Sequence, residues 1–142
     1  MNSSKKKIPG AEGLFTMEAG EPRLIAGRCK SCGTYFFPSF YPVHRPDCKE
    51  RQMEEVLLSR RGRLESYTIQ HYPPPPPFVP PDPFVPYGIG LVTLPEGVNV
   101  VGVLTGVAVE ELKTNLDVEL VVDKFYEDKD GNEVLTWMFR PI

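Results

Sequence analysis

The chain has 142 residues and a formal net charge of −3 at pH 7. That length suits one ordinary domain, or a small metal-stabilised module beside a compact barrel. The mildly acidic balance disfavours a general nucleic-acid or anionic-membrane binder, because such proteins carry an excess of positive charge. The sequence opens with no secretory signal and contains no apolar run of membrane-spanning length, so we expect a cytoplasmic protein.

Residues 1–22 predict a polar, basic tail followed by a short helical piece. Gly20 and Pro22 would end that helix. Residues 23–28 then predict a strand that leads into a cysteine-rich stretch. The helix is indicated by the spacing of four apolar residues: Leu14, Phe15, Met17 and Ala19.

All three cysteines and one of the two histidines lie between residues 28 and 50. Cys29 and Cys32 form a C-x-x-C, a tight turn whose backbone amides can face two thiolates. Cys48 lies beyond an aromatic hairpin. A second C-x-x-C would begin at position 45, but Arg45 stands there and cannot bind a cation. This spacing indicates a structural metal site with three cysteine ligands.

His44, one residue before Arg45, is the candidate for the fourth ligand. We therefore predict a structural zinc site, with iron as the alternative metal, at Cys29, Cys32, His44 and Cys48. Asp47 or a water molecule could take the fourth position instead. Free thiols and a redox C-x-x-C are the competing interpretations. A redox pair normally opens a helix in a βαβ unit, and no such pattern surrounds these cysteines.

We place the zinc ribbon at residues 23–59, with residues 53–59 as its exit strand, and a barrel at residues 60–142. Residues 109–112 predict a short helical link, and residues 95–97 and 128–132 predict turns. Five strands favour a small Greek-key OB-fold barrel over a sandwich, which needs about seven, so we expect a mainly β protein. The predicted barrel strands are residues 63–70, 87–94, 98–104, 118–126 and 134–139.

The segment at residues 73–86 reads PPPPPFVPPDPFVP. Such a run can be a polyproline ligand for another protein. Between two predicted strands it is more often a stiff loop that crosses a barrel edge. We favour the loop, because a disordered ligand arm would not carry Phe78, Phe84 and Tyr87 at such even intervals.

The order of these pieces resembles a bacterial and archaeal family in which a zinc ribbon leads into an OB-fold barrel. The likeness rests on LIAGRCKSCGTYFFP at residues 24–38, GRLESYTI at residues 62–69, VPYGIGLVTLPEGVNVVGVL at residues 85–104, and the closing strands. The chain departs from the family's usual C-P-x-C at residues 45–48. Members of this family accompany thiolase-fold enzymes that act on acyl-CoA thioesters, and they include small subunits of benzoylsuccinyl-CoA thiolases of anaerobic toluene breakdown.

This resemblance implies a hetero-oligomer with a thiolase-fold subunit that supplies the catalytic cysteine. The small subunit would stabilise that partner and shape the acyl-CoA site. On this basis we expect Phe78, Phe84 and Tyr87 to dock on the partner and border its acyl-CoA channel. The alternative is that the three rings cap the open end of the barrel.

The residues themselves agree with an auxiliary role, since no catalytic set is visible. His71 has no obvious acidic partner, and a lone histidine is more often a surface residue. A nucleic-acid-binding ribbon and OB-fold protein is the main alternative, but the strands carry few of the aromatic and basic pairs that such binding uses. An independent metal-assisted hydrolase is a further alternative, and a closed four-ligand site disfavours it.

Overall fold

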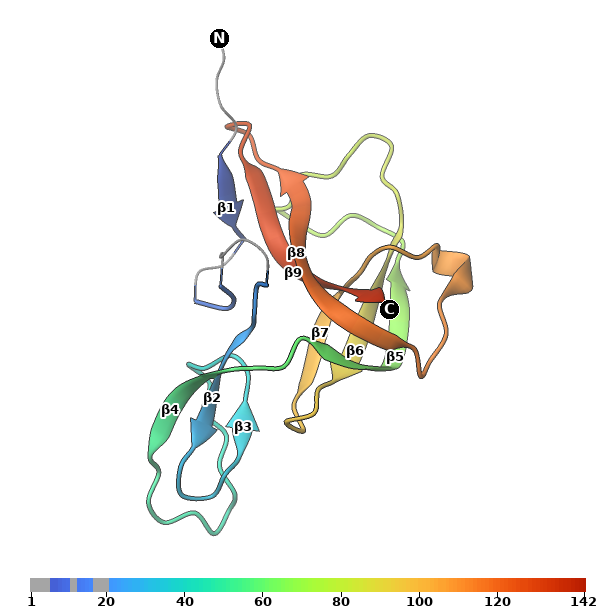
Figure 1. Ribbon diagram of the computed structural model, residues 1–142. Coiled ribbons are helices and arrows are strands. Elements are labelled where there is room, and N and C mark those ends of the chain that lie inside the picture. Colours follow the sequence, from blue (N-terminus) through green and yellow to red (C-terminus); the bar gives the residue numbers. More distant parts are fainter. Residues whose placement is uncertain (1–5, 11–12, 17–20) are drawn as a thin grey trace.

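The computed structural model describes residues 6–10, 13–16 and 21–142. A three-stranded sheet has the order β3-β2-β4, and a six-stranded sheet has the order β1-β9-β7-β6-β5-β8. An additional pairing of β9 with β8 closes the larger sheet into a barrel. The small sheet projects from one end of that barrel as an arm (Figure 1). No helix in the described ranges is long and apolar enough to cross a membrane.

The arm consists of three short strands: β2 (Ile25–Cys29), β3 (Tyr35–Phe36) and β4 (Met53–Leu57). The central strand, β2, pairs antiparallel with both neighbours. A Cβ atom at position 27 would overlap the Phe36 ring, so Gly27 allows the aromatic hairpin to lie against β2. The predicted lead and exit strands of a ribbon are confirmed.

Five strands form the barrel: β5 (Arg61–Gln70), β6 (Tyr87–Thr93), β7 (Asn99–Leu104), β8 (Asp117–Glu127) and β9 (Glu133–Pro141). Strands β5, β6 and β7 form an antiparallel meander, and β7 pairs in parallel with β9. Strand β8 pairs with both β9 and β5 and closes the ring. The predicted five-stranded OB-fold barrel is confirmed. The predicted helical link is the 3-10 turn η1 (Val109–Glu111) between β7 and β8.

Glycine allows close packing inside the barrel. A Cβ atom at Gly102 would lie 2.9 Å from Cδ2 of Phe139, a distance at which something must shift. The register between β6 and β7 runs without a shift, so Gly102 marks a close approach and not a bulge. The register shifts of the barrel lie in β5, between Leu64 and Ser66, and in β8, between Lys124 and Tyr126.

The predicted helical piece before the ribbon is absent from the described residues. Strand β1 (Lys7–Pro9) instead pairs in parallel with β9, and Phe15 forms an isolated antiparallel bridge with Leu24. Leu14 and Phe15 are buried in the main core from an extended segment. Their apolar spacing therefore reflects contacts distant in sequence and not a helical face. Met17 and Ala19 lie outside the described residues.

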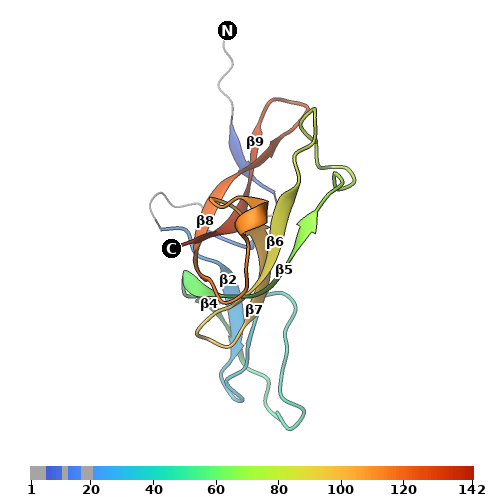
Figure 2. The same cartoon turned by 90° about the vertical axis from the view of Figure 1, so that its right-hand side faces the viewer.

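The arm and the barrel share one hydrophobic core. The Trp137 ring on β9 packs edge-on against Phe15 and Phe37, with centroid distances of 6.2 and 5.6 Å. The Arg60 guanidinium between the two sheets donates to the backbone oxygens of Pro22 at 3.2 Å and Leu120 at 2.9 Å. The ribbon extends from one end of the barrel, and the proline-rich loop lies at the other end (Figure 2).

Candidate metal centre and proline-rich loop

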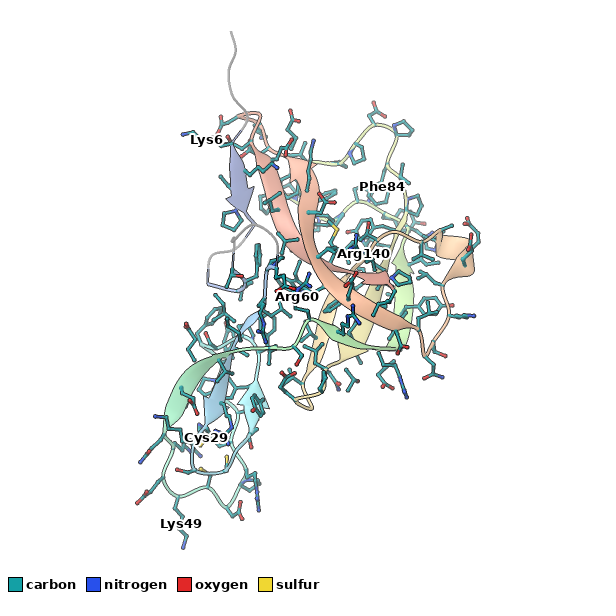
Figure 3. All side chains as sticks on the ribbon, in the orientation of Figure 1. Lys6, Cys29, Lys49, Arg60, Phe84 and Arg140 are labelled. Atoms are coloured by element: carbon teal, nitrogen blue, oxygen red, sulfur yellow. The ribbon has the colours of Figure 1, made fainter. Side chains whose placement is uncertain are left out.

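The ribbon brings together the four residues that the sequence predicts as metal ligands. One ligand atom from each of Cys29, Cys32, His44 and Cys48 lies within 4.8 Å of all the others. The Sγ atoms of Cys29 and Cys48 are 3.7 Å apart, and Nδ1 of His44 lies 3.9 Å from Cys48 Sγ. Cys29 sits in the arm well away from the barrel (Figure 3).

These distances fit a tetrahedral zinc ion. Zinc–sulfur bonds of about 2.3 Å at tetrahedral angles place two sulfurs about 3.8 Å apart. The Cys29–Cys48 separation of 3.7 Å agrees with that value. Three sulfurs and one imidazole nitrogen are also a donor set that zinc prefers over magnesium or calcium.

The turn at residues 29–33, which we call the knuckle, has the local geometry that a C-x-x-C site requires. The Gly33 amide donates to the Cys29 carbonyl oxygen at 2.8 Å, and Gly33 has a φ of +75° that favours glycine. The Cys29 amide donates to the Thr34 carbonyl oxygen at 2.9 Å, which closes the turn back onto β3. The turn thus holds the first two sulfurs in place before any metal binds.

The three cysteine thiols differ in their hydrogen bonds and burial, and their pKa values differ accordingly. A hydrogen bond with the Thr34 hydroxyl, at 3.2 Å, is the main cause that lowers the pKa of Cys32 to about 5. The backbone amide of Cys32 is the main cause that lowers the pKa of Cys29. Burial, followed by its two sulfur neighbours, raises the pKa of Cys48 to about 11. The lowered pKa values of Cys29 and Cys32 favour the thiolate form that a metal ligand takes, whereas a metal bound at Cys48 must displace a more tightly held proton.

Asp47, the competing candidate for the fourth ligand, is not among the residues whose ligand atoms cluster. Its Oδ2 atom accepts a hydrogen bond from Arg45 Nη2 at 3.0 Å, and both side chains are exposed. His44 instead packs beside the Phe36 ring, with a centroid distance of 6.4 Å. The arrangement favours His44 over Asp47, and the buried position of Cys29 is typical of a closed, structural site.

The structure places the three rings predicted for partner contact in one aromatic cluster on the barrel. Phe78 is only 9% exposed, and its ring lies 4.9 Å from Phe125 and 5.2 Å from Tyr126. Tyr87 lies 5.6 Å from Phe125, and Phe84 lies 6.0 Å from Tyr87. Phe84 and Tyr87 are half-buried. The outer two rings therefore retain surface that a partner could contact.

Some side chains with an evident role were not singled out from the sequence. Trp137 joins the ribbon to the barrel, and Phe125 lies at the centre of the aromatic cluster. Both lie in predicted strands, and only the fold shows what they contact. His71 is exposed, and the described part of the chain gives it no acidic partner.

Comparison with known proteins agrees with this architecture. Residues 18–54 match the family model of the ChsH2 rubredoxin-like zinc ribbon domain, and residues 55–123 match that of the ChsH2 C-terminal OB-fold domain. A DUF35 domain-containing scaffold protein from Pyrococcus furiosus is 39% identical over 121 residues, which are 84% of this chain and 84% of that protein.

Two further relatives are parts of enzyme complexes by name. The benzoylsuccinyl-CoA thiolase subunit BbsA from Thauera aromatica is 32% identical over 128 residues, covering 85% of this chain and 78% of BbsA. Among solved structures, the Ltp2-ChsH2(DUF35) aldolase matches with a TM-score of 0.61 and 30% identity, covering 84% of each chain.

Proposed function

The chain belongs to the ChsH2 family of zinc ribbon and OB-fold proteins, and from that premise we propose that it is a non-catalytic subunit of a thiolase-type complex acting on an acyl-CoA thioester. In this role it stabilises a thiolase-fold partner and shapes the acyl-CoA site. The observation that carries the proposal is the likeness to BbsA, a named thiolase subunit, across 85% of the chain. The likeness to the Ltp2-ChsH2(DUF35) aldolase supports it.

In this proposal the metal is structural zinc, held by Cys29, Cys32, His44 and Cys48. The ion would join the C-x-x-C turn that follows β2 to the loop that carries His44 and Cys48 back to β4. All three cysteines are then metal ligands, so none serves as the nucleophile of an acyl transfer. The partner subunit supplies that group.

The proline-rich loop contributes to the acyl-CoA site in this proposal. Phe84 and Tyr87 present their half-exposed rings to the partner, and Phe78 anchors the loop from beneath. Prolines restrict the loop before docking, so that association loses less conformational entropy. The likeness to BbsA makes benzoylsuccinyl-CoA the first acyl-CoA to test.

Purification of the tagged chain from its native host, followed by mass spectrometry, tests the proposal. We expect a thiolase-fold protein to co-elute in stoichiometric amount through affinity and size-exclusion steps. An untagged strain and a tagged, unrelated protein serve as controls. Elution of the chain alone, or with nucleic acid in place of a thiolase-fold protein, would refute the proposed function.

A further inference from the structure

Strands β6 and β7 form an outward face without a single charged residue. Burial alternates along both strands, and the register pairs Ile89 with Val103 and Leu91 with Val101. These four side chains point away from the barrel interior, and we call them the β6–β7 face. Val101 is 55% exposed and the other three are partly exposed. An antiparallel strand with one solvated side normally carries polar residues there.

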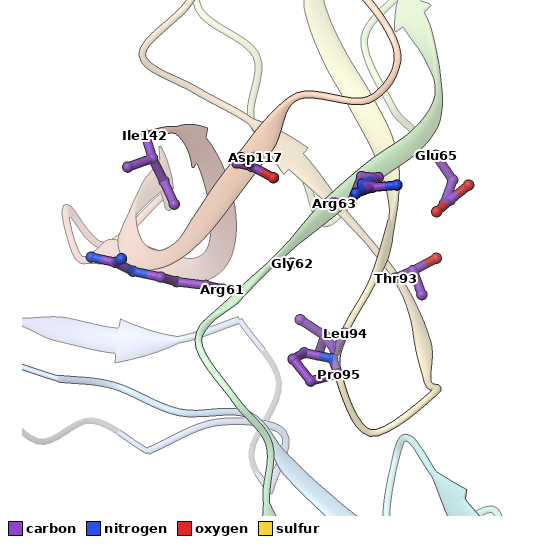
Figure 4. Close-up of a pocket in the computed structure, with 9 residues that line it drawn as sticks. All are labelled: Arg61, Gly62, Arg63, Glu65, Thr93, Leu94, Pro95, Asp117 and Ile142. Atoms are coloured by element: carbon purple, nitrogen blue, oxygen red, sulfur yellow. The ribbon is translucent and has the colours of Figure 1, made fainter.

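Other parts of the barrel surface are charged. On β8 and β9, Arg140 Nη2 lies 3.0 Å from Glu119 Oε1. A pocket of about 650 Å³ at the start of β5 is lined by Arg61 and Arg63 together with Asp117 (Figure 4). Charge is therefore distributed unevenly around the barrel. The β6–β7 face has the composition of an interface core, where charged residues are depleted.

A small pocket adjoins this face. It has a volume of about 240 Å³, and none of the described residues that line it is charged. Tyr87, Phe125 and Trp137 supply aromatic walls. Three members of the β6–β7 face also line the pocket: Ile89, Val101 and Val103. The volume is below the roughly 300–1,000 Å³ of small-molecule sites, so the pocket suits one large apolar side chain better than a whole ligand.

The β6–β7 face occupies the position at which OB-fold barrels bind their ligands. OB-fold barrels bind their ligands through the second and third strands and the loops after the first and fourth strands. Here those strands are β6 and β7, and the loop after the first barrel strand is the proline-rich loop. Binding of nucleic acid at this place requires cations that track phosphates, and β6 and β7 supply none. The composition of the face therefore favours binding of an apolar protein surface.

We infer that the β6–β7 face is where the partner subunit docks, through an uncharged, apolar patch that inserts a large side chain into the adjoining pocket. This inference rests on the proposed function and adds the location and chemistry of the contact. The lack of charge on this face supports an uncharged partner surface, because a charged partner residue buried here would find no counter-charge. Tyr87 lines the pocket and also belongs to the aromatic cluster of the proline-rich loop, so that loop and face are continuous.

A pair of matched substitutions tests the location. Val101→Glu places a charge on the face, and Val43→Glu places the same charge in the ribbon loop between β3 and β4, where Val43 is 54% exposed. The probe is the thiolase-fold protein identified by purification from the native host. We expect Val101→Glu to weaken its association at least about tenfold and Val43→Glu to change it less than about twofold. Both variants should have the melting temperature of the wild type, since both valines are largely exposed.

A third variant tests the chemistry of the contact. Val101→Lys should weaken association as Val101→Glu does, and the wild-type dissociation constant should change little between low and high salt. The inference is overturned if Val101→Glu binds as the wild type, if Val43→Glu alone loses binding, or if the Glu and Lys variants act in opposite directions. Wild-type chain that binds no thiolase-fold protein would instead refute the proposed function itself.

Discussion

The ring centroid of Phe78, in the proline-rich loop, lies 4.9 Å from that of Phe125 in strand β8. Phe78 is nearly fully buried by this contact and by Tyr126. We predict that Phe78→Ala lowers the free energy of unfolding of the isolated chain by about 3 kcal/mol, as large-to-small core substitutions do. Denaturant titration measures this. Phe40→Ala, at a ring that is 57% exposed, is the control and should change stability by less than about 0.5 kcal/mol.

The Phe84→Ala variant distinguishes two roles of the proline-rich loop, docking on the partner and capping the barrel. Its ring is half-buried against Tyr87, with a centroid distance of 6.0 Å. If the ring docks on the partner, Phe84→Ala leaves the melting temperature of the isolated chain nearly unchanged and weakens association by about 2 kcal/mol. Thermal melts and a binding titration give the two values. A clear drop in melting temperature with unchanged partner affinity would show that the ring only caps the barrel.

The metal centre predicts a defined stoichiometry. Purified chain should contain one equivalent of zinc, and a strong chelator should remove the ion together with the fold of the ribbon. His44→Ala should bind zinc more weakly, because the ion loses one of its four donors. His71→Ala, at an exposed histidine outside the ribbon, is the matched control. Elemental analysis well below one equivalent would contradict the site, and full retention in His44→Ala would contradict only the fourth ligand.

The turn between β8 and β9 predicts a dependence on pH. Asp128 accepts backbone hydrogen bonds from Asn132 at 2.8 Å and Asp130 at 3.0 Å, and the bond from Asn132 is the main cause that holds its pKa below the ordinary 3.8. A depressed pKa in the folded state stabilises the fold above pH 3.8, and this contribution is lost as the pH falls through the folded-state value.

Melting temperatures measured as a function of pH check this prediction. Asp128→Ala should melt below the wild type at neutral pH, and the difference should shrink as the pH falls below 3.8. Asp130→Ala is the control, since Asp130 contributes its backbone amide to the turn, a group that the substitution keeps. A difference that persists unchanged at the lowest pH would show that the Asp128 charge is not its cause.

Much of the fold could be predicted because its signals are local. The C-x-x-C with its glycine marks the knuckle, and alternation of apolar residues marks the barrel strands. Gly97 and Gly131, with φ of +85° and +82°, occupy the two predicted turns. The ligand set also followed from local spacing, since His44 lies next to the position where a second C-x-x-C would begin.

The rest depends on contacts between residues distant in sequence. Residues 7–9 form a strand only because the edge of β9 is available to pair with them, and nothing in their own sequence shows this. Phe15 has a spacing that suits a helix, but it is buried in the shared core, where it packs against Trp137, more than a hundred residues later. The β6–β7 face required the register, because alternation alone does not tell which side of a strand faces water.

The most direct test of the central claim is acyl-CoA turnover by separated and recombined subunits, with benzoylsuccinyl-CoA as the first substrate. We predict no thiolase or thioesterase activity for the rigorously purified chain alone, and activity when the thiolase-fold partner is added. The expected effect of the chain is on the partner's stability and on the Michaelis constant for the acyl-CoA. Turnover by this chain in the absence of any partner would contradict the account.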